Sequence, residues 1–213
     1  PYEKGFREVA AIRQIGSTGV PGNAAGQFKT PRGVAIAPDG RIVVADSGNH
    51  RIQVFDPQGN YLTGWGSECR LYEEGQPGCV DPDGDGPLQL GDGQFQEPWG
   101  VAVDRDGNVY VADTWNHRIQ KFTLEGKFLA KWGFFATTDG QLGQPVAMWG
   151  PRAIAIDSNG NVYVTDTGNR RVQKFDPQGN FLAQYGGGGV IEGYFDEPVG
   201  LAVDAQDNFY VAD

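Results

Sequence analysis

The sequence has few residues of the kinds that build zinc centres, membrane spans or nucleic-acid surfaces. It contains 2 Cys, 2 His and 1 Met among 213 residues. No run of about 18 apolar residues occurs, so no segment of this chain is expected to span a membrane. Acidic residues outnumber basic ones by 27 to 17, and no basic stripe is present, which disfavours nucleic-acid binding. The chain starts at Pro1 rather than at Met, so we expect it to be a piece of a longer protein.

What the sequence has in abundance is glycine, placed within an internal repeat. The residues of segment 109–122 return with few changes in two other copies, and all length differences fall between copies. Such self-similarity indicates a repeat architecture. Segment 9–16 fits the end of an earlier copy. The aligned copies are 33–66, 100–133, 153–186 and, in part, 200–213.

Each copy contains four short apolar runs separated by turn signals. The first run ends at Asp106-Gly107, a dipeptide suited to the positive φ angles of a tight hairpin, whereas the fourth copy has Asp207-Asn208 there and is expected to turn differently. Segments 56–59 and 176–179 read Asp-Pro-Gln-Gly, with glycine expected at the left-handed position. Four-stranded antiparallel sheets repeated at this length predict an all-β fold, a β-propeller. In the second copy the predicted strands are 100–103, 108–112, 118–122 and 128–132.

The residues between the second and third runs resemble the NHL repeat. Segment 46–52 reads Asp-Ser-Gly-Asn-His-Arg-Ile, and 113–119 and 166–172 match it, with Arg170 in place of the histidine. The resemblance implies that residues 1–213 form a single, partial NHL-like propeller of about six blades, of which about four are visible here.

The Asp-x-x-Asn-x-Arg motif is interpreted as structural, because it recurs in every copy whereas a functional centre needs one constellation. We expect Asp113 and Asn116 to cap the turn through side-chain to backbone hydrogen bonds, and Arg118 to pair with a carboxylate. His50 and His117 belong to the same motif and are interpreted as turn residues rather than ligands.

Alternating strand directions place the second-to-third turns and all the inserts between copies on one face of the disc, here called the insert-bearing face. Variable loops on a rigid scaffold usually carry binding, so this face is predicted to hold a partner. Trp115 stands where two sister copies have glycine, and is either an exposed binding anchor or a side chain packed against an insert. Two arginines near the axial channel either contact an anionic ligand or bond a neighbouring loop. The candidate partner-binding residues are Arg32, Trp99, Trp115 and Arg152.

The acidic insert, residues 67–97, contains a spacing typical of a calcium loop. Eight acidic residues and one basic residue lie in it, and a carboxylate occupies positions 1, 3, 5 and 12 of the loop, with glycine at position 6. The loop resembles those of extracellular repeat proteins more than an EF-hand pair, since no helices flank it and aspartate replaces the final glutamate. This pattern predicts a Ca²⁺ site; the alternative is a solvated acidic turn. The candidate ligands are Asp81, Asp83, Asp85, Pro87, Gln89 and Asp92.

The only two cysteines, Cys69 and Cys79, lie in this same insert. They predict a disulfide and therefore an oxidising location, which is extracellular, cell-surface or periplasmic. The alternative is a pair of free thiols. Without a nearby histidine they make a poor zinc site.

Two function classes are compatible with these features. The first is a non-catalytic extracytoplasmic scaffold that binds a protein or surface glycan through the insert-bearing face, alone or as a subunit of a larger assembly. The alternative is an enzyme, because some propellers that this chain resembles are lyases or lactonases with a metal at the axial channel. Here no first strand carries a histidine, so an active site would need blades outside this sequence. The RNA-binding mode of some NHL proteins needs a basic face, which the acidic insert disfavours.

Overall fold

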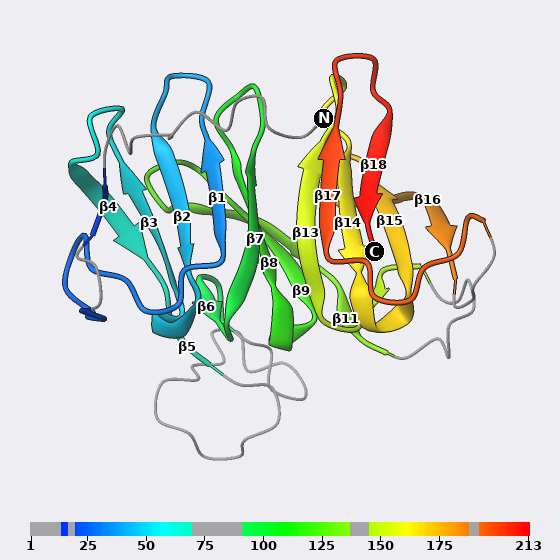
Figure 1. Ribbon diagram of the computed structural model, residues 1–213, viewed down its shortest axis with the longest axis horizontal. Coiled ribbons are helices and arrows are strands. Elements are labelled where there is room, and N and C mark those ends of the chain that lie inside the picture. Colours follow the sequence, from blue (N-terminus) through cyan, green and yellow to red (C-terminus); the bar gives the residue numbers. More distant parts are fainter. Residues whose placement is uncertain (1–13, 17–19, 70–90, 137–144, 188–191) are drawn as a thin grey trace, which may run out of the picture.

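The computed structural model describes residues 14–16, 20–69, 91–136, 145–187 and 192–213. These residues form three four-stranded antiparallel sheets and one two-stranded antiparallel sheet, which stand side by side (Figure 1), together with two short parallel strand pairs. The predicted all-β propeller architecture is therefore confirmed, with three full blades and half of a fourth. Of the predicted strand at 9–16, residues 9–13 lie outside the described part, and Gln14 to Gly16 are not in a strand.

Each blade follows the order predicted from the repeat. The first contains β1 (Gly33–Ile36), β2 (Ile42–Asp46), β3 (Arg51–Phe55) and β4 (Tyr61–Trp65). The second contains β7 (Pro98–Val103), β8 (Val109–Asp113), β9 (Arg118–Phe122) and β10 (Phe128–Trp132). The third contains β13 (Pro151–Ile156), β14 (Val162–Asp166), β15 (Arg171–Phe175) and β16 (Phe181–Gly186). The half-blade contains β17 (Gly200–Val203) and β18 (Phe209–Ala212).

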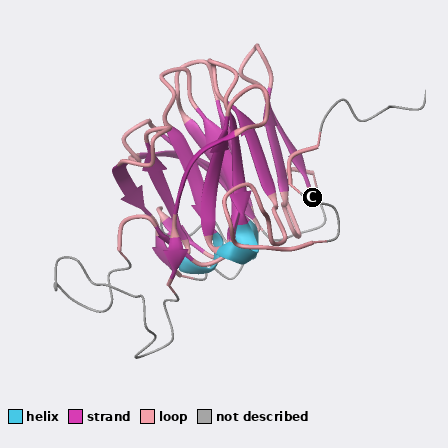
Figure 2. Cartoon of the chain, turned by 90° about the vertical axis from the view of Figure 1, so that its left-hand side faces the viewer, coloured by secondary structure: helices cyan, strands magenta, loops and turns pink. Residues whose placement is uncertain are grey.

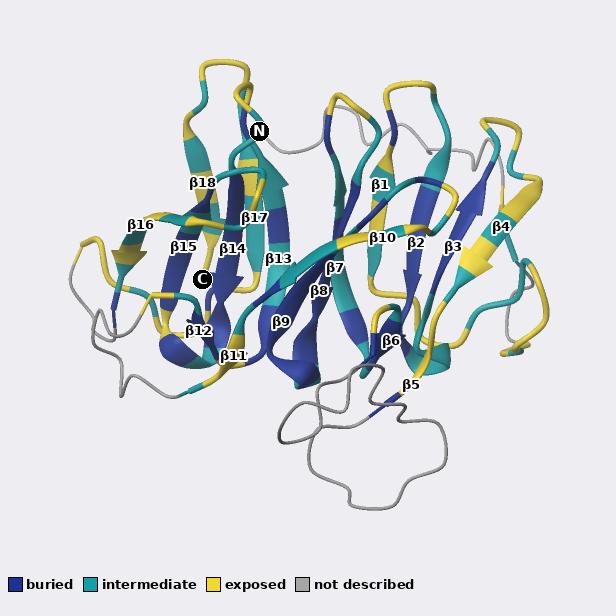
Figure 3. Ribbon diagram, turned by 180° about the vertical axis from the view of Figure 1, so that it is seen from behind, coloured by how far each residue is buried: buried dark blue, intermediate teal, exposed yellow. Residues whose placement is uncertain are grey.

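The hydrophobic core lies between neighbouring blades rather than within one. Ala45, Ile52 and Val54 of the first blade pack with Val109 and Val111 of the second, and an equivalent cluster joins the second blade to the third. Figure 3 shows the middle strands of the blades buried, and their outermost strands a mixture of intermediate and exposed residues. A single sheet cannot cover both of its apolar faces, so stacking of blades supplies the core.

The connections divide between two faces as predicted. First-to-second and third-to-fourth hairpins lie at the upper rim in Figure 1. The lower rim carries the second-to-third connections, which are short 3-10 helices: η1 (Ser47–Asn49), η2 (Thr114–Asn116) and η3 (Thr167–Asn169). Figure 2 shows these helices together at that rim, which is the insert-bearing face.

The hairpin at Asp106-Gly107 differs in detail from the prediction. Only the glycine takes a positive φ, at 83°, while Asp104 accepts the turn hydrogen bond from the Gly107 N–H at 3.1 Å. The expectation of a different turn in the fourth copy is also wrong, because Asp207 takes the glycine's place with φ 64°. Its short polar side chain tolerates the left-handed conformation. The predicted left-handed glycines are confirmed at Gly59 and Gly179.

The outermost strand of each blade carries a β-bulge. The register shifts on either side of Leu62, Leu129 and Leu182, and these side chains are 42–50% exposed. A bulge bends an edge strand and interrupts its row of backbone donors and acceptors. The perimeter of the disc is thereby protected against pairing with another strand.

Two of the inserts begin and end in short parallel strand pairs. β5 (Ser67–Glu68) pairs with β6 (Gln94–Phe95), and β11 (Phe134–Phe135) pairs with β12 (Ala147–Met148). Both ends of each of these two inserts are thus held together directly beneath the blade from which it leaves.

Candidate functional site

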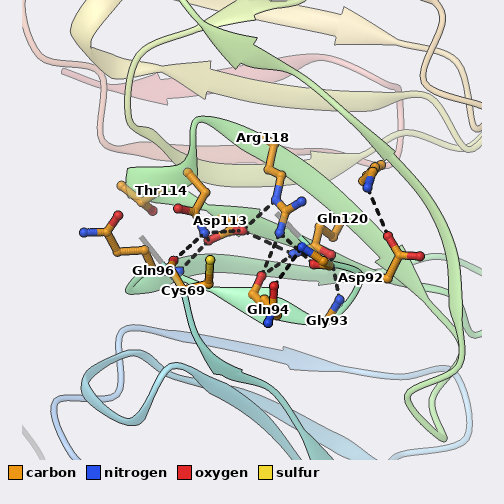
Figure 4. A network of polar contacts seen from close by, with 12 residues as sticks. Cys69, Asp92, Gly93, Gln94, Gln96, Asp113, Thr114, Arg118 and Gln120 are labelled. Carbon is orange, nitrogen blue, oxygen red and sulfur yellow. Dashed lines mark hydrogen bonds and ion pairs between the residues drawn. The ribbon is translucent and has the colours of Figure 1, made fainter. Parts of the chain in front are cut away.

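The repeated motif forms a buried polar network in each blade, drawn for the second blade in Figure 4. Asp113 is fully buried and accepts hydrogen bonds from the Gln96 N–H at 2.7 Å, from Arg118 Nε at 2.8 Å and from Gln120 Nε2 at 3.2 Å. Burial raises the pKa of the Asp113 carboxyl, and the Arg118 guanidinium acts in the opposite direction. Arg118 also donates to the Gln94 carbonyl at 2.8 Å. The network therefore ties the end of the insert to its blade.

The prediction that the aspartate caps its own turn is wrong, because its hydrogen-bond partner lies elsewhere. No side-chain cap bond forms at η2, because the Asp113 carboxylate faces the segment that precedes its own blade. Asn116 instead donates to that carboxylate at 3.0 Å and to the Cys69 carbonyl at 3.1 Å. The pairing of Arg118 with a carboxylate is confirmed. The same aspartate–arginine contact occurs in the other two full blades, at 2.8 Å in each, so the motif is structural.

Two histidines connect neighbouring blades. His117 occupies the left-handed position after η2, and its Nδ1 accepts the Gly150 N–H at 3.0 Å. His50 does the same for the Glu97 N–H at 3.1 Å. Burial lowers the pKa of His117 to about 4, so the ring is neutral at physiological pH. Their interpretation as turn residues is confirmed, and each also holds the start of the next blade.

Three of the predicted partner-binding residues form one stack where the first strands of three neighbouring blades begin. The guanidinium carbon of Arg32 lies 3.9 Å from the centroid of the Trp99 ring, and that of Arg152 lies 4.4 Å from it. Such contacts are favourable cation–π interactions. Trp99 and Arg152 lie within β7 and β13 rather than just before the first strand. Each of these strands begins one residue earlier, at a proline. We call Arg32, Trp99 and Arg152 the rim stack.

Carboxylates neutralise the rim stack. Glu97 lies 3.7 Å from Arg32, and Glu197 lies 2.6 Å from Arg152. The arginines are therefore paired with neighbouring loops, as one of the two interpretations expected. Their side chains remain 39% and 19% exposed, so the stack is also accessible from solvent.

Trp115 lies beside a cavity of about 420 Å³ on the insert-bearing face. The side chain is half-buried, and its ring edge passes over Gly150. Trp115 thus packs against the neighbouring segment, as one interpretation expected, and its role as a binding anchor stays a prediction. A second tryptophan, Trp149, lines the same cavity and is 41% exposed. Trp149 is not among the residues predicted from the sequence, although Lys29 and Gln96 at the matching positions mark it as a departure from the repeat.

The acidic insert is described only at its base. Cys69 is buried, and its N–H donates to the Phe95 carbonyl at 3.0 Å. Asp92 forms an ion pair with Lys131 of β10 at 3.2 Å. Cys79 and the other predicted calcium ligands, Asp81, Asp83, Asp85, Pro87 and Gln89, lie outside the described residues.

The described residues contain neither a metal-binding cluster nor a membrane-spanning helix. Among them, no group of three or more His, Cys, Asp or Glu side chains is placed to hold a metal ion. In the same part of the chain, no helix has the length and apolar character needed to cross a bilayer.

Comparisons with known proteins agree with this geometry. The model of the NHL repeat matches residues 28–55, 95–122 and 148–175, one match for each full blade. The protein brain tumor of Drosophila melanogaster is 31% identical over 163 residues, which are 76% of this chain and 13% of that protein. A Caenorhabditis elegans protein named probable peptidyl-alpha-hydroxyglycine alpha-amidating lyase is 29% identical over 153 residues, 71% of this chain and 38% of that protein.

Solved structures share the fold at lower identity. A streptogramin B lyase structure superposes with a TM-score of 0.55 at 15% identity, covering 85% of this chain and 47% of that one. The chain thus spans about half of that propeller and a smaller share of both sequence relatives. The repeated motif, the four-stranded blades and these matches agree, and the chain belongs to the NHL-repeat β-propellers.

Proposed function

We propose that this chain is a non-catalytic binding propeller that holds a protein or glycan partner on its insert-bearing face. The observation that carries the proposal is the rim stack, in which Trp99 is held between Arg32 and Arg152. Tryptophan and arginine are the residue types most enriched among the side chains that dominate binding energy at interfaces. A stacked, ion-paired arrangement is already ordered, so a partner has less side-chain entropy to remove.

The fate of the repeated polar residues supports a non-catalytic role. In each full blade the motif's aspartate, asparagine and arginine are engaged in contacts that hold the blade together. The motif's two histidines use Nδ1 as an acceptor for a backbone N–H, which leaves that nitrogen unavailable for proton transfer or metal binding.

An extracytoplasmic location and a calcium-stabilised insert are part of the same proposal. Support comes from the insert's carboxylate spacing and from its two cysteines, of which Cys69 is buried at the insert's base. A calcium ion that uses Asp92 has to draw this carboxylate away from Lys131. A disulfide and a bound cation would both stabilise a segment that has little core of its own.

The alternative function is a lyase, favoured by the similarity to an amidating lyase over 71% of the chain. The first strands of the described blades carry no histidine, so an axial metal site would depend on residues from elsewhere in the protein. Turnover of a peptidyl-α-hydroxyglycine substrate, abolished by a chelator, would support this alternative.

The test is a partner screen with two matched variants of the full chain. Immobilised wild-type protein is probed with a glycan array and with purified extracellular proteins, and each hit is remeasured with Arg32→Ala and Leu129→Ala. Both side chains are about 40% exposed, but Leu129 lies on the outer edge of its blade. The proposal expects Arg32→Ala to weaken binding about tenfold or more and Leu129→Ala to leave it unchanged. Binding lost only in Leu129→Ala overturns it.

A further inference from the structure

The cavity beside Trp115 lies on the insert-bearing face, where the turn of the second blade, the turn of the third blade and the segment before the half-blade meet. Its volume of about 420 Å³ falls at the lower end of the range for small-ligand sites. We call it the twin-tryptophan cavity. The side chains that give it its chemistry are Trp115, Trp149, Arg152, Arg170, Asp196 and Glu197.

Two indole rings supply the apolar part of the wall. Trp149 rests on Gly168 and is 41% exposed, so much of its surface remains free. Trp115 comes from the second-to-third turn of the neighbouring blade and passes over Gly150. Aromatic faces carry negative partial charge and attract the C–H groups of a ligand laid against them.

The charged part of the wall is already neutralised. Arg152 pairs with Glu197 at 2.6 Å, and Arg170 lies 3.5 Å from Asp196. The four charges sum to zero, so an anionic or a cationic ligand would have to compete with an existing ion pair. The carboxylates nevertheless face solvent, with side-chain exposures of 65% for Glu197 and 79% for Asp196. The cavity thus offers acceptors and donors together, without net charge.

The backbone around the cavity offers little to a peptide. The N–H groups of Trp149, Gly150 and Gly168 are bonded to Asp166, His117 and Trp149 at 2.7–3.0 Å. An extended peptide needs free main-chain donors and acceptors to add itself to a sheet. Recognition here must therefore rely on side chains.

We propose that the twin-tryptophan cavity binds a neutral saccharide unit. The C–H face of a sugar ring packs on the exposed indole of Trp149, and Trp115 closes the opposite side. Sugar hydroxyls donate to the carboxylates of Asp196 and Glu197 and accept from the guanidinium groups of Arg152 and Arg170, because a hydroxyl is both donor and acceptor. This inference rests on the proposed binding function and chooses a glycan over a protein as the ligand of this site.

The test uses the indole N–H signals of the five tryptophans in two-dimensional NMR. Neutral trisaccharides of glucose, mannose, galactose or N-acetylglucosamine are titrated into the full chain, with sulfated and sialylated glycans as charged comparisons. We expect a neutral sugar to shift the Trp115 and Trp149 signals and to leave those of Trp65 and Trp132 in place, because the latter two indole N–H groups are buried.

Variants assign the binding to this cavity. Trp115→Gly restores the residue found in the other two turns, at 48 and 168, and should fold normally. Trp149→Ala removes the main stacking face. Both are expected to weaken binding about tenfold or more. Tyr61→Ala, whose side chain is also 41% exposed but lies on the first blade, should leave binding unchanged.

The possible outcomes separate this inference from the proposed function. Saturable shifts of Trp115 and Trp149 that both tryptophan variants abolish support the saccharide site. Tighter binding of charged glycans, or a sugar response that survives both variants, overturns it and leaves the binding proposal standing. A protein partner that binds through the rim stack, without any response to sugars, also overturns the saccharide site and leaves the binding proposal standing. Absence of any partner in both assays overturns both proposals.

Discussion

The indole of Trp149 lies against Gly168 so closely that a Cβ atom at residue 168 would stand 2.4 Å from its Cδ2 atom. In the neighbouring blade the arrangement is exchanged, since the turn carries Trp115 and the residue matching Trp149 is Gln96. A large side chain thus comes either from the turn or from the segment opposite it, and not from both. This exchange places two tryptophans around one cavity.

The contact predicts the effect of Gly168→Ala. The φ angle of Gly168 is not in the left-handed region, so the added methyl group acts through collision with the ring rather than through backbone strain. We expect the free energy of unfolding to fall by about 1–3 kcal/mol and the Trp149 indole signal to move. The double variant Gly168→Ala/Trp149→Ala should recover most of that loss. Equal losses in the single and double variants, measured by urea unfolding, would show that the ring is not the cause.

The buried aspartates predict a graded series of stabilities. Asp166→Asn leaves the fully buried Arg171 without its carboxylate partner, and this should cost about 3–5 kcal/mol. Asp113→Asn should cost nearly as much, since the Arg118 side chain is 7% exposed. Asp46→Asn should cost least, because the Arg51 side chain is 18% exposed and retains some hydration. Denaturant unfolding of the three variants tests the order, and equal effects would contradict the burial argument.

His117 predicts a loss of stability in mild acid. Its pKa is about 4 in the folded chain and about 6.5 when unfolded, so the unfolded state binds a proton first as the pH falls. The stabilisation is therefore complete above about pH 6.5 and is lost as the pH drops towards 4, by up to about 3 kcal/mol. Protonation also removes the acceptor for the Gly150 N–H.

The matched variant is His117→Asn. Asparagine tolerates the left-handed φ of 56° at this position and keeps an acceptor for the Gly150 N–H. Its stability should change less between pH 6.5 and pH 4 than that of the wild type, as followed by thermal unfolding. The same pH dependence in both proteins would mean that His117 is not the titrating group.

The repeat allowed the blades, the strand order and the two faces to be predicted, because each local signal returns in every copy. Contacts across copies were harder to predict. The partner of Asp113 is the N–H of Gln96, 17 residues earlier and outside the aligned copy, so the motif by itself predicts only a turn cap. The parallel pairing of β5 with β6 was missed because two-residue strands leave no periodic pattern.

The rim stack could be predicted from the sequence, whereas the contact of Trp149 could not. Arg32, Trp99 and Arg152 stand at matching positions, and matching positions of neighbouring blades lie side by side in a propeller, so their proximity follows from the alignment. Trp149 lies four residues before Ala153, outside the copies aligned from the sequence. Its carbonyl accepts the Gly168 N–H at 2.8 Å, and Lys29 and Gln96 make the same contact with Gly48 and Trp115 at 2.9 and 3.3 Å. The repeat therefore extends further towards the N-terminus than the aligned copies, and the contact with Gly168 lay outside them.

The cysteines predict a disulfide that protects the base of the insert. Cys69 is 2% exposed, so labelling has to be done on the denatured, non-reduced protein. We expect no reactive thiol under these conditions and two after reduction. Two reactive thiols before reduction would remove the argument for an oxidising compartment.

The carboxylate spacing from Asp81 to Asp92 predicts calcium binding with one competitor built into the fold. Calorimetric titration of the full chain should show a saturable heat that Asp83→Ala abolishes, because the central carboxylate of the loop is lost. Asp92 is paired with Lys131 at 3.2 Å, so Lys131→Met should tighten calcium binding if Asp92 is the final ligand. Asp92→Asn should weaken binding, and in that background Lys131→Met should have little further effect. No heat in the wild type would show that the acidic insert is only a solvated turn.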